Sequence, residues 1–306
     1  MEQLSNTTIA VAINEFLWHC RFEKNLDIKT IRAYQTDLEQ FTGIIDKSRP
    51  IKGIARTDIK GYLQAISSFQ PKTIKRKLAS LRAMLNYFEC EDETYVNPMR
   101  KMQIRIREPI RLPAVMTAEE LRSILKEVYK TTGPSPHSCK MKLRDIAVVE
   151  LLFATGIRVS ELCNLKIRDV NVAQGIIHII GKGNKERIIY VCQQETISAL
   201  FHWQQKRNTT KDCDPFFINR LGKPLSPQSV RHMIHRLTRQ TGLKKHITPH
   251  TFRHTLATML LEEDVDIRYI QSILGHSSIA TTQLYTHVNI SKQKQIFQIK
   301  HPRRWI

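Results

Sequence analysis

Residues 248–263 read TPHTFRHTLATMLLEE, and this stretch predicts a helix with two histidines and an arginine near its beginning. Thr248 can cap the first backbone N–H groups of a helix, and Pro249 suits the first helical position, where an N–H would lack a partner anyway. Apolar residues recur at helical spacing on one face, whereas His250 and Arg253 share the other. Taken alone, such a polar face is typical of a solvated surface. The rest of the chain must decide whether it is a site.

The composition indicates a globular protein with a polyanionic partner. The chain has 306 residues, more than one core usually holds, so two domains are expected. Its 48 Lys+Arg against 28 Asp+Glu give a formal net charge of +20, which favours nucleic acid as the partner. The six cysteines form no CxxC pair, which argues against disulfides and zinc and fits a reducing cytoplasm. No signal peptide or bilayer-spanning stretch is recognisable, so no membrane partner is expected.

The first hundred residues predict four helices, at residues 7–20, 27–45, 58–66 and 72–89. Basic residues crowd the beginning of the fourth helix, where a merely solvated surface would more often mix charges of both signs. This favours a helix that contacts DNA phosphates, and a basic face that only aids solubility is the alternative. The candidate DNA-binding residues are Lys72, Lys75, Arg76, Lys77 and Arg82.

A linker follows these helices. Residues 97–116, NPMRKMQIRIREPIRLPAVM, combine three prolines with alternating Arg and Ile, which favours an extended chain. Thr117 and Glu120 then form a capping box that opens a new helix. The expected organisation is an N-terminal helical DNA-binding domain at residues 1–103, a linker at 104–115 and a second domain with a C-terminal tail at 116–306.

The second domain combines helices with one β-hairpin. Residues 175–191, GIIHIIGKGNKERIIYV, place two Ile-rich runs around glycines and an asparagine that suit a tight turn. Residues 131–140, TTGPSPHSCK, are expected to form a surface loop. The predicted fold class is therefore mostly α with a small β-sheet or hairpin: a helical N-terminal domain plus an α+β domain. The helices expected in the second domain cover residues 141–157, 159–165, 226–241, 248–263 and 266–274, with a short one at 277–288.

Three further motifs accompany the opening helix. ATGIRVSEL contains Arg158, GKGNKER contains Lys182, and LGHSSIATTQLYTHV contains His276 and Tyr285. Together with His-x-x-Arg on the opening helix, they resemble the tyrosine recombinase, or phage integrase, family in its Xer-like two-domain form. The likeness is strong over residues 115–290 and looser over the N-terminal helices, which resemble a core-binding domain. Each motif alone is weak, but four in the family's order form a strong signal.

The resemblance implies a site-specific recombinase or integrase that cuts and rejoins DNA through a covalent 3′-phosphotyrosyl intermediate, without metal or ATP. Arg158 and Arg253 would hold the scissile phosphate, because a guanidinium donates two parallel hydrogen bonds and keeps its charge. Tyr285 would be the nucleophile, and His250 would accept its proton.

The two remaining roles concern the leaving group and the phosphate. Lys182 would protonate the leaving 5′-oxygen, and His276 would hydrogen-bond the phosphate. Lys185 and Arg187 lie close to Lys182 in the sequence, so the choice among the three depends on the family pattern GKGxKxR. Glu161 is expected to orient a neighbouring basic group.

The resemblance also implies partners and a location. The expected partners are double-stranded DNA and further copies of the chain, which would associate into a synaptic tetramer on DNA. The expected location is the bacterial cytoplasm. The amphipathic residues 290–306 are expected to dock on a neighbouring subunit, with folding onto their own domain as the alternative. A catalytically silent, sequence-specific DNA-binding protein of the same fold is the alternative function, and a metal-dependent nuclease is a weaker one.

Overall fold

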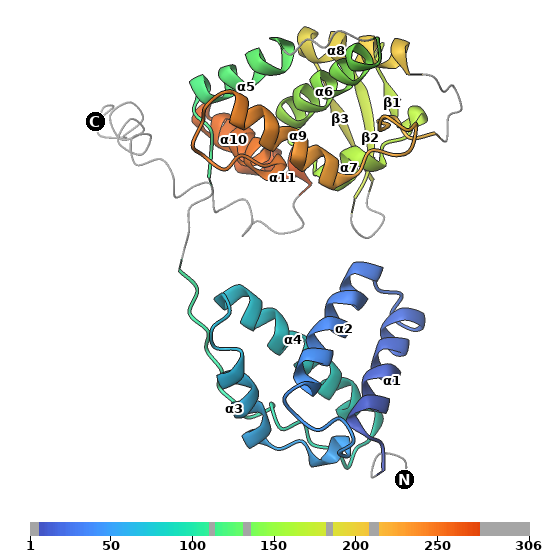
Figure 1. The fold of residues 1–306 in the computed structure, drawn as a ribbon, viewed down its shortest axis with the longest axis vertical. Coiled ribbons are helices and arrows are strands. Elements are labelled where there is room, and N and C mark those ends of the chain that lie inside the picture. Colours follow the sequence, from blue (N-terminus) through green and yellow to red (C-terminus); the bar gives the residue numbers. More distant parts are fainter. Residues whose placement is uncertain (1–5, 110–113, 131–135, 182–185, 208–213, 276–306) are drawn as a thin grey trace, which may run out of the picture. The chain divides into compact units, whose positions relative to one another are not determined.

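The structure, a computed structural model, describes residues 6–109, 114–130, 136–181, 186–207 and 214–275. The chain divides into two compact units, Met1–Ile110 and Arg111–Ile306. Each unit has its own buried hydrophobic core. Figure 1 shows the helices of the first unit in blue and teal and the helices and strands of the second in green to orange.

The first unit is helical, as the sequence predicts. Thr8 caps α1 by accepting from the backbone N–H of Val11, Asp27 caps α2, and Pro71 starts α4. Large apolar side chains fill the core of this unit, among them the buried Phe16 and Phe88. The four α-helices that the structure describes here are α1 (Ile9–Phe22), α2 (Ile28–Thr42), α3 (Arg56–Ala65) and α4 (Pro71–Glu91), with a 3-10 turn η1 (Ile51–Gly53) between α2 and α3.

The second unit combines helices with a small sheet. Thr117 and Glu120 form the predicted capping box, with reciprocal hydrogen bonds of 3.2 and 2.8 Å. The described elements are α5 (Ala118–Lys130), α6 (Pro136–Thr155), α7 (Val159–Asn164), η2 (Ile167–Asp169), β1 (Val170–Asn171), β2 (Ile176–Ile180), β3 (Glu186–Tyr190), α8 (Gln194–Lys206), α9 (Pro227–Gln240), α10 (Pro249–Glu262) and α11 (Ile267–Leu274).

The predicted hairpin is present as β2 and β3, in an antiparallel sheet of order β1-β2-β3. Register pairs Ile177 with Ile189 and Ile179 with Arg187. Because side chains alternate across a pleated sheet, these four share one face, and the three isoleucines among them are buried. The opposite face is open to solvent, where Tyr190 is exposed.

Three features differ from the sequence-based expectation. Residues 136–140 begin α6 rather than belonging to a loop. Strand β1 and helix α8 were not predicted. The signal for α8 is present in the sequence, since Thr196, Leu200 and Trp203 recur at helical spacing and all three are buried.

Helix α10 has three close helical neighbours among the described elements of the second unit. It packs against α6, α9 and α11 (Figure 1). Phe252 is buried as expected, but Arg253 and Ala257 on the polar face are buried as well. Ala257 packs with Ile270 and Leu274 of α11, so α11 covers the face that the sequence pattern leaves open. The arginine of this helix is therefore an interior residue rather than a surface one.

Among the helices that the structure describes, none is both long enough and apolar enough to cross a bilayer.

Candidate active site

The turn between α6 and α7 brings Arg158 to the site. Helix α6 ends at Thr155, and Gly156 takes a positive φ of 58°, a conformation that glycine adopts without steric cost. A Cβ at Gly156 would also lie 2.7 Å from a methyl group of Leu274. Gly156 is therefore suited to this position for two reasons: it allows the turn after α6, and it leaves room for Leu274 of α11. Arg158 then occupies the N-cap of α7.

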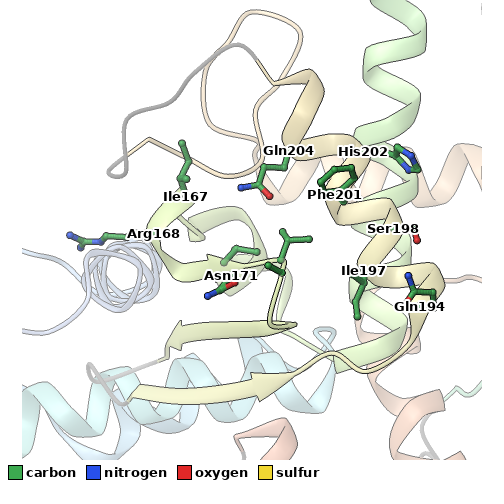
Figure 2. A pocket seen from close by; sticks show the side chains of 12 residues that line it. Ile167, Arg168, Asn171, Gln194, Ile197, Ser198, Phe201, His202 and Gln204 are labelled. Atoms are coloured by element: carbon green, nitrogen blue, oxygen red, sulfur yellow. The ribbon is translucent and has the colours of Figure 1, made fainter.

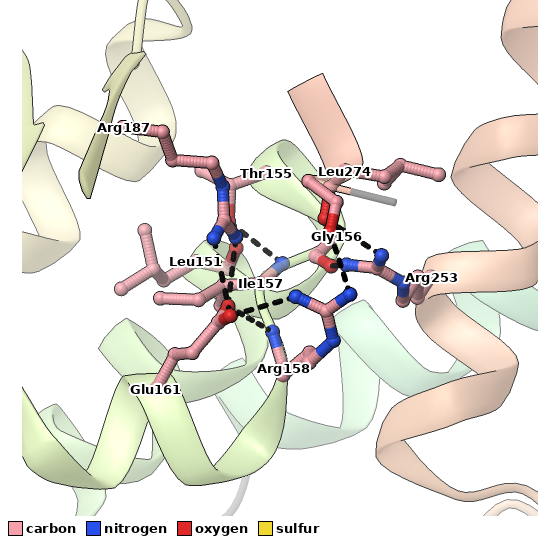
Figure 3. A network of polar contacts seen from close by, with 10 residues as sticks. Leu151, Thr155, Gly156, Ile157, Arg158, Glu161, Arg187, Arg253 and Leu274 are labelled. Atoms are coloured by element: carbon pink, nitrogen blue, oxygen red, sulfur yellow. Dashed lines mark hydrogen bonds and ion pairs between the residues drawn. The ribbon is translucent and has the colours of Figure 1, made fainter. Parts of the chain in front are cut away.

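Arg253 is held from two directions. Its Nη1 donates to the carbonyl of Gly156 and its Nη2 to the carbonyl of Leu274, each at 2.7 Å (Figure 3). The residue is 3 % exposed. Burying a charge without partners is costly, so these carbonyls both stabilise the guanidinium and fix its orientation.

Arg158 reaches the same end of α11. Its Nη2 donates to the carbonyl of Gly275 at 2.7 Å, and its Nη1 donates to a carboxylate oxygen of Glu161 at 2.8 Å (Figure 3). The last carbonyls of a helix lack partners within that helix and carry the negative end of its dipole, and those of Leu274 and Gly275 lie at this end of α11. Two arginines that are distant in sequence therefore share one helix terminus as their acceptor.

His250 lies on the first turn of α10, three residues before Arg253, and unlike Arg253 it is exposed. Partial desolvation lowers the pKa of His250, and the positive charges of Arg253, Arg231 and Arg158 lower it further. At neutral pH its imidazole is therefore uncharged and can accept a proton. Arg231 lies on α9, and no spacing in the sequence relates it to α10, so sequence reasoning missed its proximity to His250.

His254 follows one turn later on α10. Burial lowers the pKa of His254 to about 4, with smaller contributions from His250 and Arg253. The rings of His250 and His254 have centroids 6.5 Å apart. Both histidines are therefore neutral at physiological pH, and His254 stays uncharged well into the acid range.

The structure brings together three of the six predicted catalytic residues, Arg158, His250 and Arg253. Lys182, His276 and Tyr285 lie outside the described residues, as do the short helix predicted at 277–288 and the tail at 290–306. Lys182 falls in the connection between β2 and β3, and His276 directly follows Gly275, the C-cap of α11.

The predicted DNA-binding residues all lie on α4, but they differ in exposure. Lys72, Lys75 and Arg82 are exposed, and Lys75 pairs with Glu108 at 2.8 Å. Arg76 is half exposed and pairs with Asp37.

Lys77 differs from the expectation of a DNA contact. It is 3 % exposed, and its ammonium group lies 3.3 Å from a carboxylate oxygen of Asp37, which is itself buried, and also contacts Gln40. Ser80 donates to the same carboxylate at 2.8 Å. A buried carboxylate needs such compensation, so Lys77 connects α4 to α2 inside the first unit.

A pocket of about 710 Å³ lies elsewhere in the second unit. Figure 2 shows side chains of α8, among them Ile197 and Phe201, facing Ile167 and Asn171 from η2 and β1. Of the predicted catalytic residues that the structure describes, none lines this pocket. The chemistry-bearing cluster is therefore the one around Arg158 and Arg253.

Two family models match the chain. The phage integrase family matches residues 114–292, and the phage integrase N-terminal SAM-like domain matches residues 13–91. Among curated relatives, a tyrosine recombinase of Agathobacter rectalis is 47 % identical over 296 residues, covering 95 % of this chain and 96 % of that protein. Tyrosine recombinase XerD of Listeria innocua is 35 % identical over 300 residues, covering 95 % of this chain and 98 % of the relative.

Solved structures agree on the fold. The XerA recombinase superposes with a TM-score of 0.53 at 26 % identity, covering 95 % of this chain and 98 % of that one. XerH bound to a palindromic difH substrate gives 0.75 at 22 % identity, with 97 % and 91 % covered. A lambda integrase tetramer bound to a Holliday junction gives 0.71 at 18 % identity, with 92 % and 77 % covered.

The order of the motifs, the paired arginines and both family matches lead to one conclusion. The chain belongs to the phage integrase family of tyrosine recombinases, the enzymes that break and rejoin DNA at specific sites.

Proposed function

We propose that this site-specific recombinase cleaves DNA with six residues, Arg158, Lys182, His250, Arg253, His276 and Tyr285. The observation that carries the proposal is the convergence of Arg158 and Arg253 on the carbonyls at the end of α11, beside an uncharged His250. Two fixed cations next to a neutral base suit a reaction at an anionic phosphodiester.

The proposed reaction is a transesterification. The oxygen of Tyr285 attacks the phosphorus, a bond forms between that oxygen and phosphorus, and the bond from phosphorus to the 5′-oxygen breaks. His250 accepts the phenol proton, and Lys182 gives a proton to the leaving 5′-oxygen. Arg158 and Arg253 stabilise the negative charge that builds up on the non-bridging oxygens, where losing one donor typically costs about 3–4 kcal/mol of barrier. His276 adds a hydrogen bond to the same phosphate.

Rejoining is the reverse reaction with a new 5′-hydroxyl. The energy of the broken phosphodiester is kept in the phosphotyrosine bond, so the proposed cycle needs neither ATP nor a metal ion. Proton transfer also reverses, with Lys182 accepting a proton from the incoming hydroxyl and His250 returning one to Tyr285.

We propose double-stranded DNA as the partner and a tetramer on DNA as the working assembly. The net charge of +20 supports the first, and the DNA complexes of XerH and of the lambda integrase tetramer support both by analogy.

Residues 1–103 would form the DNA-binding domain, residues 104–115 the linker and residues 116–306 the catalytic domain. On α4, the exposed Lys72, Lys75 and Arg82 and the half-exposed Arg76 are the proposed phosphate contacts, and the bacterial cytoplasm is the proposed location.

A covalent adduct distinguishes this function from a catalytically silent DNA-binding protein. DNA attached to the chain in cells, recovered after denaturation and sequenced, would identify the target site. A nicked duplex of that sequence would then trap the intermediate, because the short cleaved strand diffuses away. We expect a protein–DNA band that survives denaturation and forms equally in excess EDTA. Binding without any adduct would support the silent alternative, and an EDTA-sensitive cleavage without adduct would support a nuclease.

A further inference from the structure

Glu161 lies between two arginines. Its carboxylate accepts from Nη1 of Arg158 at 2.8 Å, and from Nη1 and Nη2 of Arg187 at 3.1 and 2.7 Å (Figure 3). It also accepts from the backbone N–H of Arg158 at 3.1 Å. The Glu161 side chain is only 5 % exposed, so protein groups and not water satisfy this carboxylate.

The fold directs Arg187 into this cluster. Arg187 is paired with Ile179 across the hairpin, on the inward face of the sheet, so its side chain must leave β3 toward the interior. There it also packs against Gly275, where an added Cβ would lie 3.0 Å from the guanidinium carbon of Arg187. Strand β3, the start of α7 and the end of α11 therefore meet at this one guanidinium.

The charges of the cluster do not cancel. If Glu161 faced Arg158 alone, the pair would be neutral, and the field that Arg158 offers to a phosphate would be largely lost. Arg187 adds a second positive charge, so the three residues together keep a net positive charge. The net charge of the cluster has a strong effect because the cluster is buried, and charges are screened poorly where the effective dielectric is low. Burial alone would raise the pKa of Glu161, but hydrogen bonds from Arg187 and Arg158 outweigh it and hold the pKa below its usual value, so the carboxylate is ionised.

We propose that Arg187 is a positioning residue that neutralises Glu161, so that Glu161 can orient Arg158 without consuming the positive charge that Arg158 brings to the scissile phosphate. The proposal rests on the phosphate-binding role proposed for Arg158. It gives Arg187 a task different from that of Lys182, because Arg187 acts through Glu161 and Arg158 and not on the leaving group. The competing explanation is that Arg187 merely anchors the hairpin strand that leads to Lys182.

A charge cycle separates the two explanations. The variants are Arg187→Met, Glu161→Gln and the double variant, compared by single-turnover cleavage of the nicked duplex with saturating protein. Arg187→Met leaves the cluster without net charge, and we expect cleavage to slow about 10- to 100-fold. The double variant regains the net positive charge, and the amide oxygen introduced by Glu161→Gln can still accept from Arg158. We therefore expect the double variant to cleave at least about fivefold faster than Arg187→Met. A double variant as slow as Arg187→Met or slower overturns the proposal.

Modified substrates also separate the two explanations, because a role in charge and a role in anchoring the hairpin predict different cleavage defects on them. A methylphosphonate at the scissile position carries one negative charge less, so the defect of Arg187→Met should shrink on it. A 5′-bridging phosphorothiolate needs no protonation of its leaving group, so the defect should persist on it. Rescue by the phosphorothiolate instead, or a defect of equal size on all substrates, contradicts the proposal. Arg187→Lys keeps the positive charge but loses the two parallel donors of the guanidinium. Its cleavage rate should lie between those of Arg187→Met and the wild type.

A matched control comes from the same unit. Asp145 also lies between two arginines, Arg144 at 2.6 Å and Arg236 at 3.0 Å, and the pocket that these three line includes none of the described catalytic residues. Arg236→Met should therefore cleave bound DNA at the wild-type rate on every substrate. Arg158→Met keeps the two proposals distinct. If Arg158→Met cleaves normally, the proposed active site is wrong, whereas a slow Arg158→Met with a normal Arg187→Met contradicts only the role of Arg187.

Discussion

The guanidinium of Arg253 donates a hydrogen bond of 2.7 Å to the carbonyl of Leu274, which ties the first half of α10 to the last residue of α11. The same side chain donates to Gly156, and the next carbonyl along, that of Gly275, accepts from Arg158. A single helix terminus therefore sets the positions of both proposed phosphate-binding arginines. Anything that moves the end of α11 should change catalysis as well as stability.

Arg253→Lys tests this double role. The ammonium group keeps the charge but cannot donate along both directions of the guanidinium fork, so one buried carbonyl loses its partner. We expect the free energy of unfolding to fall by about 1–3 kcal/mol, measured by urea denaturation, and cleavage of the nicked duplex to slow about 100-fold or more. If unfolding changes and cleavage at saturating protein does not, Arg253 is only structural.

Gly156→Ala tests the close approach of α11. The positive φ and a Cβ 2.7 Å from Leu274 should together destabilise the second unit by about 2–4 kcal/mol. Gly222→Ala is the matched control, because Gly222 has a φ of 74° but open space around its Cβ. The control should cost only the backbone strain, about 1 kcal/mol. Equal losses in urea denaturation of the two variants would show that the contact with Leu274 is unimportant.

His254 should make stability depend on pH. Its folded pKa of about 4 lies below the unfolded value of about 6.5, so protonation favours the unfolded chain. The stability gained from a neutral His254 is present above about pH 6.5 and is lost as the pH falls toward about 4, by about 2–3 kcal/mol. The carboxylates titrate in both wild type and His254→Gln, so their contribution cancels when the two free energies of unfolding are subtracted. The stability difference between wild type and variant should shrink or reverse over this window, and a constant difference would contradict the assignment.

Truncation after Val288 tests the expected role of the C-terminal residues 290–306. We expect near-normal affinity for a single site, because the basic surfaces on α4 and around the catalytic cluster remain, but loss of cooperative binding to paired sites and of recombination. Gel-shift titration on one-site and two-site DNA measures both properties. Unchanged cooperativity in the truncated chain would rule out docking on a neighbour and favour a tail folded on its own domain.

Local signals in the sequence predict local structure well. Thr248 accepts from the N–H of Thr251 at 3.3 Å, as expected of the N-cap of α10, and Gly275 ends α11 in the left-handed conformation. These features depend on residues within one helical turn of each other. The motif order likewise identified the family, because spacing along the chain is all that it requires.

Contacts between distant residues are what the sequence could not supply. Lys77 resembles its basic neighbours on α4, and its contacts with Asp37, 40 residues earlier, and with Gln40 make it an interior residue. Arg187 was an alternative to Lys182 in the sequence, and strand register turns it toward Glu161 instead. The burial of Ala257 depends in the same way on α11. In each case a tertiary partner overrides a pattern that is ambiguous locally.

We propose that this chain cuts DNA by forming a covalent bond through Tyr285, and the adduct formed on a nicked duplex tests this proposal. The wild type should give a denaturation-resistant protein–DNA species, and peptide mass mapping should place the nucleotide on Tyr285. Tyr285→Phe removes only the nucleophilic oxygen, so it should bind the duplex with unchanged affinity and give no adduct. An adduct formed by Tyr285→Phe, or mapped to another residue in the wild type, would show that Tyr285 is not the nucleophile.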